Sequence, residues 1–227
     1  MRTRLIVAVD GPAGAGKSTV CRLLASQLGY AYLDTGGMYR AMAWAALSEN
    51  LNIEDENDIA RHIELLPMRF TMGNGVMQIA YGERILEDEL RQPEISNLAS
   101  RISQLRCVRD YLTRCQRQLG EKGGIVAEGR DMTTIVFPDA PVRVYLYADL
   151  KVRAQRRYLE YQGKGIPAEF KAMEEQIQAR DEADERRALA PLRAAPGVRI
   201  LDTTHMEIAE VVQQLLEMIQ SKELEGD

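Results

Sequence analysis

The chain has 227 residues and a mass of 25.6 kDa, enough for one domain with a full hydrophobic core, with or without an insert. Hydrophobic residues make up 45% and charged residues 28% of the sequence, which excludes extensive disorder and a fibrous repeat. The net charge of −5 argues against binding to a nucleic-acid backbone. Even so, 23 of the 29 basic residues are arginine, the side chain best suited to gripping phosphate.

The cysteines and the hydropathy pattern bear on location. The 3 cysteines are odd in number and lack metal-ligand spacing, which is typical of reduced thiols. No apolar run is long enough to cross a membrane. The apolar run at residues 5–9 ends too early for a signal peptide, because Asp10 interrupts it and no cleavage site follows. We therefore expect a mature cytoplasmic protein with no membrane partner.

Short β-branched runs alternate with amphipathic helical patterns along the chain. In chain order, the patterns predict a strand at 5–9, a helix at 17–28, a strand at 31–33, helices at 38–47 and 107–119, strands at 125–127 and 142–147, helices at 150–161 and 169–180, a strand at 198–201 and a helix at 206–219. Thr204 and Glu207 have the spacing of a capping box for the last helix. This alternation predicts an α/β fold around a five-stranded parallel sheet.

Two segments interrupt the alternation. Residues 67–93 contain two strand-like runs around Gly73, Asn74 and Gly75, which predicts a β-hairpin within an antiparallel insert. Residues 162–167 contain two glycines and a proline between arginine-rich helices, which favours a mobile hinge or lid.

The strongest motif follows the first predicted strand and opens the first predicted helix. It fits the phosphate-loop pattern G-x-x-x-x-G-K-[ST], in which backbone N–H groups cradle phosphates at a helix N-terminus. We predict that Lys17 reaches the β- and γ-phosphates of ATP and that the Ser18 hydroxyl binds Mg²⁺. No Asn is followed by Lys, so the guanine-binding motif of a GTPase is missing. The predicted ATP-binding residues are Gly11, Pro12, Ala13, Gly14, Ala15, Gly16, Lys17, Ser18 and Thr19.

Charged residues follow two other buried strands, at the sheet edge where α/β proteins bind ligands. Arg40 belongs to the run that begins at Asp34 and could grip a second anion opposite the phosphate loop. Arg130 lies between Glu128 and Asp131, after the third predicted strand of the sheet. Either Glu128 or Asp34 could hold the water ligands of the metal, and the sequence leaves this open.

Residues 180–192 are rich in both signs of charge. Arg180, Asp184 and Arg187 would share one face of a helix. Taken alone, such a pattern is more often a solvated charged face than a binding site.

Together these segments resemble bacterial-type cytidylate kinases, over about residues 5–219. The matching motifs are D-[ST]-G-x-x-Y-R at 34–40, V-R-x-x-L-x-x-x-Q-R at 108–117, [DE]-G-R-D at 128–131, V-F-P-D-A at 136–140 and R-D-x-x-D-x-x-R-x-x-x-P-L at 180–192. This combination is far more specific than the phosphate loop, and it reverses the interpretation of residues 180–192 as a solvated face.

The resemblance implies a three-layer P-loop nucleoside monophosphate kinase fold with a five-stranded parallel core sheet, an antiparallel β insert and a short lid. The core would span residues 1–66 and 94–227, the nucleoside-monophosphate-binding insert 67–93 and the lid about 153–167. The reaction would transfer the γ-phosphoryl group of ATP, with Mg²⁺, to CMP or dCMP.

The resemblance also assigns roles to particular side chains. Those expected to act on the transferred phosphoryl group are Lys17, Arg130, Arg153, Arg157 and Arg180. Those expected to bind CMP are Arg40, Arg130 and Arg187 at its phosphate, Ser100, Arg109 and Asp131 at its cytosine, Arg180 and Asp184 at its sugar, and Thr35 and Tyr39 beside them.

Two positions depart from the family pattern. Gly37 replaces a usual Ala, which should only soften the start of a helix. Thr133 stands where a Gly-Thr pair is usual, so if this position needs a positive φ, Thr133 would be strained and Asp131 displaced.

Two other functions compete with this interpretation. Another small-molecule P-loop kinase, for shikimate or dephospho-coenzyme A, would share the phosphate loop but would not need the hairpin or the segments around Arg109 and Arg180. A nucleotide switch without enzymatic activity would need guanine or ATPase sensor motifs, which are not evident. His62 and His205 are expected to be bystanders, because a phosphate monoester needs no general base. We expect a monomer whose partners are small nucleotides.

Overall fold

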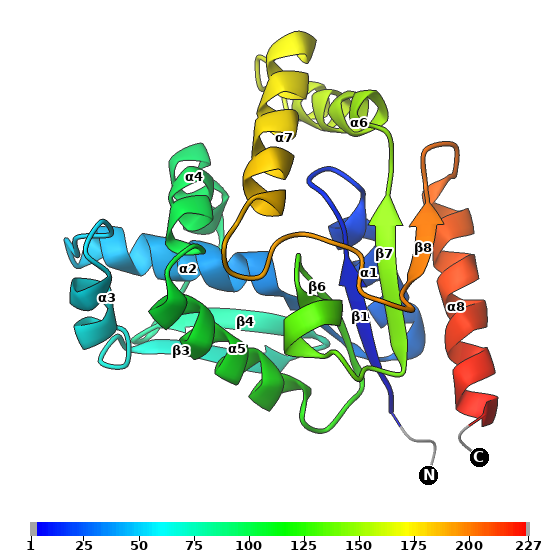
Figure 1. Cartoon of the computed structure of the whole chain (residues 1–227), viewed down its shortest axis with the longest axis horizontal. Coiled ribbons are helices and arrows are strands. Elements are labelled where there is room, and N and C mark those ends of the chain that lie inside the picture. The colour runs from blue at the N-terminus through cyan, green and yellow to red at the C-terminus, as the bar shows by residue number, and fades with distance from the viewer. Residues whose placement is uncertain (1–3, 226–227) are drawn as a thin grey trace.

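The computed structural model of the protein describes residues 4–225, and its core is a parallel sheet between two layers of helices (Figure 1). The parallel strands run in the order β2, β6, β1, β7, β8. The predicted five-stranded parallel sheet is confirmed, and each predicted strand end lies within one residue of the observed one. The bounds are β1 (Ile6–Asp10), β2 (Ala31–Asp34), β6 (Ile125–Glu128), β7 (Val142–Tyr147) and β8 (Arg199–Asp202).

The two faces of the sheet bury separate apolar clusters because side chains alternate along each strand. In β1, Val7 and Val9 pack with the helices α1 (Lys17–Leu28) and α8 (Ile208–Glu225). Ala8, between them, faces the other cluster, which includes α2 (Thr35–Ser48), α4 (Pro93–Ile102) and α5 (Arg106–Gly120). Because both faces are covered, the strands read as continuous apolar runs in the sequence.

The predicted hairpin is confirmed as β3 (Met68–Gly73) and β4 (Val76–Tyr81), with the short strand β5 (Arg84–Ile85) beside β4. Asn74 and Gly75 have φ values of 51° and 77°, the pattern of a type I′ turn. The β4 strand also pairs in parallel with β2, through Val76 and Tyr32, so the hairpin extends the core sheet. The division into a 67–93 insert and a core remains a prediction.

Above the carboxyl ends of β1 and β7 stand two helices, α6 (Leu150–Gly163) and α7 (Phe170–Glu185) (Figure 1). The segment predicted as a lid, 153–167, therefore lies mostly in α6. Gly163 is still helical, whereas Gly165 has a positive φ of 67°. The sequence patterns missed α3 (Glu56–His62) and α4, which are short and carry many polar residues.

The capping box predicted at residues 204–207 is wrong. Helix α8 begins at Ile208, and the N–H of Glu207 donates to Oε2 of Glu210 at 2.7 Å. The Thr204 hydroxyl instead donates to Oδ1 of Asp202 at 2.5 Å and accepts from the N–H of Asp149 at 3.0 Å. Thr204 thus ties the end of β8 to the start of α6.

The structure also shows the state of the cysteines and the hydropathy of the helices. The three cysteines are free thiols, and Cys21 is buried in the core between α1 and the sheet. Within residues 4–225, none of the helices is both long and apolar enough to cross a membrane.

Candidate functional site

The phosphate loop connects β1 to α1 across the top of the sheet. Gly14 and Gly16 have positive φ values of 75° and 86°, which glycine adopts without strain. A Cβ on Gly11 would lie 2.2 Å from the carbonyl oxygen of Leu146, so only glycine lets the loop pass so close to β7. No side chain caps α1, and its first backbone N–H groups therefore remain available to an anion.

Lys17 is buried at the start of α1. Its Nζ donates to the carbonyl oxygens of Gly11 at 2.8 Å and Pro12 at 2.7 Å. Burial, together with the positive charge of Arg130, lowers the pKa of Lys17 to about 7. A phosphate in the loop would favour the charged form and draw the ammonium away from the carbonyl groups.

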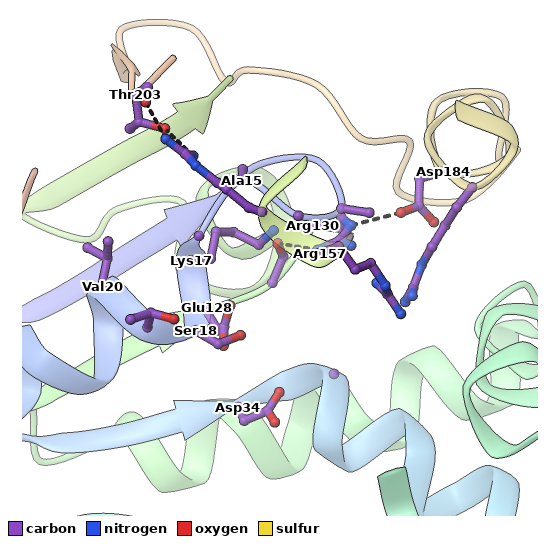
Figure 2. Close-up of a pocket in the computed structure, with 18 of the residues that line it drawn as sticks. Ala15, Lys17, Ser18, Val20, Asp34, Glu128, Arg130, Arg157, Asp184 and Thr203 are labelled. Atoms are coloured by element: carbon purple, nitrogen blue, oxygen red, sulfur yellow. Dashed lines mark hydrogen bonds and ion pairs between the residues drawn. The ribbon is translucent and has the colours of Figure 1, made fainter. Parts of the chain in front are cut away.

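Glu128, at the end of β6, lies beside Ser18 (Figure 2). Burial and the neighbouring carboxylate of Asp34 raise the pKa of Glu128, whereas Lys17 and a hydrogen bond with Ser18 oppose the rise. The Tyr32 hydroxyl donates to the Glu128 carboxylate and holds it in place. The pair formed by Ser18 and Glu128 offers the hard oxygen ligands that suit Mg²⁺.

Asp34 is engaged differently. It caps α2 by accepting the N–H of Gly37 at 2.8 Å, and it pairs with Nη2 of Arg40 at 2.8 Å. Of the two carboxylates that the sequence left open as metal-water ligands, Glu128 thus has the better placement.

Arginines converge on the centre of the cavity, with Asp184 among them. Arg130 Nε donates to one oxygen of Asp184 at 2.8 Å (Figure 2). Arg187 Nη2 donates to the other oxygen, also at 2.8 Å. Arg180 Nε is buried and has no hydrogen-bond partner among the described residues. Burial lowers the pKa of Arg180 to about 10, and the nearby guanidinium groups of Arg130, Arg157 and Arg40 contribute. The cluster therefore has an excess of positive charge, which favours a bound anion.

Arg109 and Asp131 form a second buried ion pair in the cavity, with side-chain exposures of only 7% and 5%. Arg109 Nη1 also donates to the carbonyl oxygen of Ser103 at 3.0 Å, and its guanidinium lies 5.7 Å from the ring centre of Tyr39. Ser100 lines the same cavity. Such a group of directional donors and acceptors can read the edge of a planar base.

The strain anticipated at Thr133 is absent. Thr133 is not among the non-glycine residues with positive φ in the described chain. Its hydroxyl instead donates to Asp10 at 2.6 Å, and Asp131 keeps its place opposite Arg109.

A single cavity of about 960 Å³ joins these groups. Eighteen of the residues predicted for the site line it: Ala13, Gly14, Ala15, Gly16, Lys17, Ser18, Thr19, Thr35, Tyr39, Arg40, Ser100, Arg109, Arg130, Asp131, Arg157, Arg180, Asp184 and Arg187. Gly11, Pro12 and Arg153 are not in the lining. The structure therefore brings the phosphate loop, the arginine cluster and the Arg109–Asp131 pair to one cavity.

Arg153 differs from its predicted position at the transferred phosphoryl group. It is buried, and it donates to the carbonyl oxygens of Ala148 at 2.7 Å and Ala13 at 2.8 Å. It also pairs with Asp181, which accepts the N–H of Ala13 at 3.0 Å. Arg153 of α6 and Asp181 of α7 thus hold the phosphate loop against these two helices.

The sequence prediction missed the end of the cavity nearest α8. Residues 203–208 and Val152, Arg156 and Leu159 of α6 line it. Arg156 donates to the Thr203 carbonyl oxygen at 2.6 Å. His205 also lines the cavity, and its expected role as a bystander in the reaction stays a prediction. The available signal was that residues 203–206 follow a parallel strand, at the edge where ligands bind.

Comparisons with known proteins agree with this geometry. Residues 7–221 match the family profile described as Cytidylate kinase. The cytidylate kinase of Carboxydothermus hydrogenoformans is 44% identical over 95% of this chain and 97% of its own, and that of Bacillus cereus is 38% identical over 96% and 97%. An uncharacterized protein from Eubacterium ventriosum shares the fold, with a TM-score of 0.51 at 11% identity, over 96% of this chain and 99% of its own. The chain belongs to the cytidylate kinase family.

Proposed function

We propose that this protein transfers the γ-phosphoryl group of ATP to CMP or dCMP, giving ADP and CDP or dCDP. The observation that carries the proposal is the single cavity that joins a phosphate loop to an arginine cluster and a buried Arg109–Asp131 pair. Donor phosphates on the loop and an acceptor nucleotide against the pair would both place their phosphates among the arginines.

The donor is held by the loop backbone and Lys17, with its base toward α8. There, the side chains of Val152, Leu159 and Met206 offer apolar surface for a purine, while Arg156 is held in place by Thr203. Mg²⁺ bound with ATP would be held by the Ser18 hydroxyl and, through water, by Glu128, and it would neutralise phosphate charge when bound.

The acceptor is held at three points. Arg40, Arg130 and Arg187 surround its phosphate, Asp184 and Arg180 meet its sugar, and Arg109, Asp131 and Ser100 face its base. Asp131 accepts from the N4 amine of cytosine and Arg109 donates to N3, so both must loosen their mutual ion pair when the base enters.

Catalysis then requires positioning and charge neutralisation only. The phosphate of CMP is already ionised at neutral pH and attacks the γ-phosphorus directly, so no general base is needed. Lys17, Arg130, Arg157 and Arg180 stabilise the charge that spreads over the migrating phosphoryl group. Closure of α6 and α7 over the cavity would keep water from competing with CMP.

An assay of ADP release tests the proposal, with ATP and with CMP, dCMP, UMP, AMP and GMP offered separately. We expect turnover with CMP and dCMP to exceed that with UMP, AMP and GMP. Preference for UMP or a purine nucleotide, or release of ADP without dependence on an acceptor, would refute it.

A further inference from the structure

Asp10 is a fully buried carboxylate that lies outside the lining of the cavity, with 0% of its surface exposed. It is the last residue of β1 and directly precedes the phosphate loop. Its two oxygens accept three hydrogen bonds, from the Met132 N–H at 2.8 Å, the Thr133 N–H at 2.7 Å and the Thr133 hydroxyl at 2.6 Å. All three donors lie more than 100 residues away in the sequence.

These bonds hold one side of a tight turn. On the other side, the N–H of Gly129 donates to the carbonyl oxygen of Val9 at 3.0 Å. Hydrogen bonds to Val9 and Asp10, at the end of β1, therefore hold the chain both before and after Arg130 and Asp131. Both of those side chains face the cavity, Arg130 toward Asp184 and Asp131 toward Arg109.

The turn continues into a short π-helical segment, η2 (Met132–Val136). The N–H groups of Ile135 and Val136 both bond to the carbonyl oxygen of Asp131, at 2.9 and 3.1 Å. Those of Met132 and Thr133 are instead satisfied by Asp10, which caps the segment across the fold. The far end of the segment is held separately, by Arg117, which donates to the carbonyl oxygens of Ile135 and Val136.

We infer that Asp10 is a positioning residue for acceptor binding: its carboxylate fixes the turn that aims Arg130 at the acceptor phosphate and Asp131 at the acceptor base. This inference rests on the proposed function, because it concerns how the CMP site is held. Asp10 also connects the two halves of the site, because the strand that ends at Asp10 continues directly into the phosphate loop.

The chemistry requires a carboxylate at this position. One oxygen of Asp10 accepts from the Met132 N–H, and the other accepts from the N–H and the hydroxyl of Thr133. An asparagine has only one acceptor oxygen, so in either orientation its amide N–H₂ would point at a backbone N–H, donor against donor. The Thr133 hydroxyl adds a third donor to the two backbone N–H groups.

The test compares Asp10→Asn, Thr133→Val and Thr133→Ser with the wild type. Thr133→Val removes only the hydroxyl donor, whereas Thr133→Ser keeps it. Arg117→Gln is the matched control, because it releases the same segment at the end away from Asp131. For each protein, kcat and KM for CMP and UMP, KM for ATP, and Tm are measured.

We expect Asp10→Asn to raise KM for CMP about 10-fold or more and to lower the CMP/UMP ratio of kcat/KM, with a smaller effect on KM for ATP. Thr133→Val should shift the ratio in the same direction by a smaller factor, and Thr133→Ser should restore it. Arg117→Gln should lower Tm without changing the ratio. If Asp10→Asn does not fold, the comparison of Thr133→Val with Thr133→Ser carries the test.

The inference is overturned if Asp10→Asn, or Thr133→Val where the first does not fold, lowers Tm but keeps the wild-type KM and CMP/UMP ratio. It is also overturned if Arg117→Gln changes the ratio as much as these variants do. A wild type that does not prefer CMP would instead refute the proposed function, and the two failures are therefore distinct.

Discussion

The Arg109–Asp131 pair yields the sharpest prediction about substrate choice. Cytosine presents an N4 donor and an N3 acceptor, and uracil reverses both. With UMP, Asp131 would face the O4 acceptor and Arg109 would face the N3–H donor. Each buried mismatch costs about 1–3 kcal/mol, and more for charged groups, so two of them give roughly 10²–10⁴-fold discrimination.

Replacing Asp131 with Asn should remove much of that discrimination. The amide can turn a donor toward O4 of uracil, so kcat/KM should fall more for CMP than for UMP. The substitution also leaves Arg109 without its charged partner in a buried site, although the Ser103 carbonyl oxygen still accepts from it. Removing one partner of a buried ion pair costs about 3–5 kcal/mol, and the shape of Asn should hold the loss in stability below that.

The assay is kcat/KM for CMP and UMP by coupled ADP release, with Tm measured in parallel. Glu54→Gln is the matched control. It makes the same change of carboxylate to amide in the Arg101–Glu54 pair, whose side chains are 59% and 70% exposed, so it should change neither the ratio nor, by more than about 1 kcal/mol, the stability. An unchanged CMP/UMP ratio in Asp131→Asn would remove Asp131 from the base site.

Further predictions concern the phosphate loop. Lys17→Ala should lower kcat about 10²–10³-fold while CMP binding, measured by calorimetry, stays near the wild-type value; near wild-type turnover would contradict the donor assignment. Burial lowers the pKa of Lys17 to about 7 in the free protein, so we expect a substantial uncharged fraction at pH 8. Bound ATP should raise this pKa, and binding should therefore be accompanied by proton uptake. Calorimetry at pH 8 in buffers of different ionisation enthalpy should detect this uptake in the wild type and a smaller one in Lys17→Ala, and equal values would contradict the shift. Arg153→Lys cannot reproduce the bonds to Ala13, Ala148 and Asp181, so it should lower stability by about 2–4 kcal/mol and raise KM for ATP. A large loss of kcat at unchanged Tm would instead restore Arg153 as a catalytic residue.

Local patterns in the sequence were sufficient for most of the fold. The five parallel strands are short apolar runs because both faces of the sheet are covered, and such runs are visible in sequence. The phosphate loop is also local, since the residues that shape it are consecutive. The turn at Asn74 and Gly75 was predictable for the same reason. Helix α3 was missed because it is short and buries only Ile59, which leaves no periodic signal. The buried residues of α4 do recur at helical spacing, as Ile95, Ala99 and Ile102, so that signal was present in the sequence and was overlooked.

The part of the cavity proposed to bind the acceptor could be predicted less well from the residues alone. Residues 180–192 look like a solvated charged helix, and only the resemblance to a family changed that interpretation. Nothing in the local sequence indicates that Asp184 meets Arg130, which lies 54 residues earlier. Such a pairing depends on how α7 packs against the edge of the sheet, and this packing is a property of the tertiary structure.

Arg153 and Arg157 illustrate the same limit over a single helical turn. Both belong to one arginine-rich run, and the resemblance to the family assigned them the same predicted role. In the structure, Arg157 lines the cavity, whereas Arg153 is buried against the loop and Asp181. Gly14 makes that contact possible, because a Cβ there would lie 3.1 Å from the Cβ of Arg153. Two arginines one helical turn apart thus have different surroundings: Arg153 holds the phosphate loop in place, and Arg157 lines the cavity.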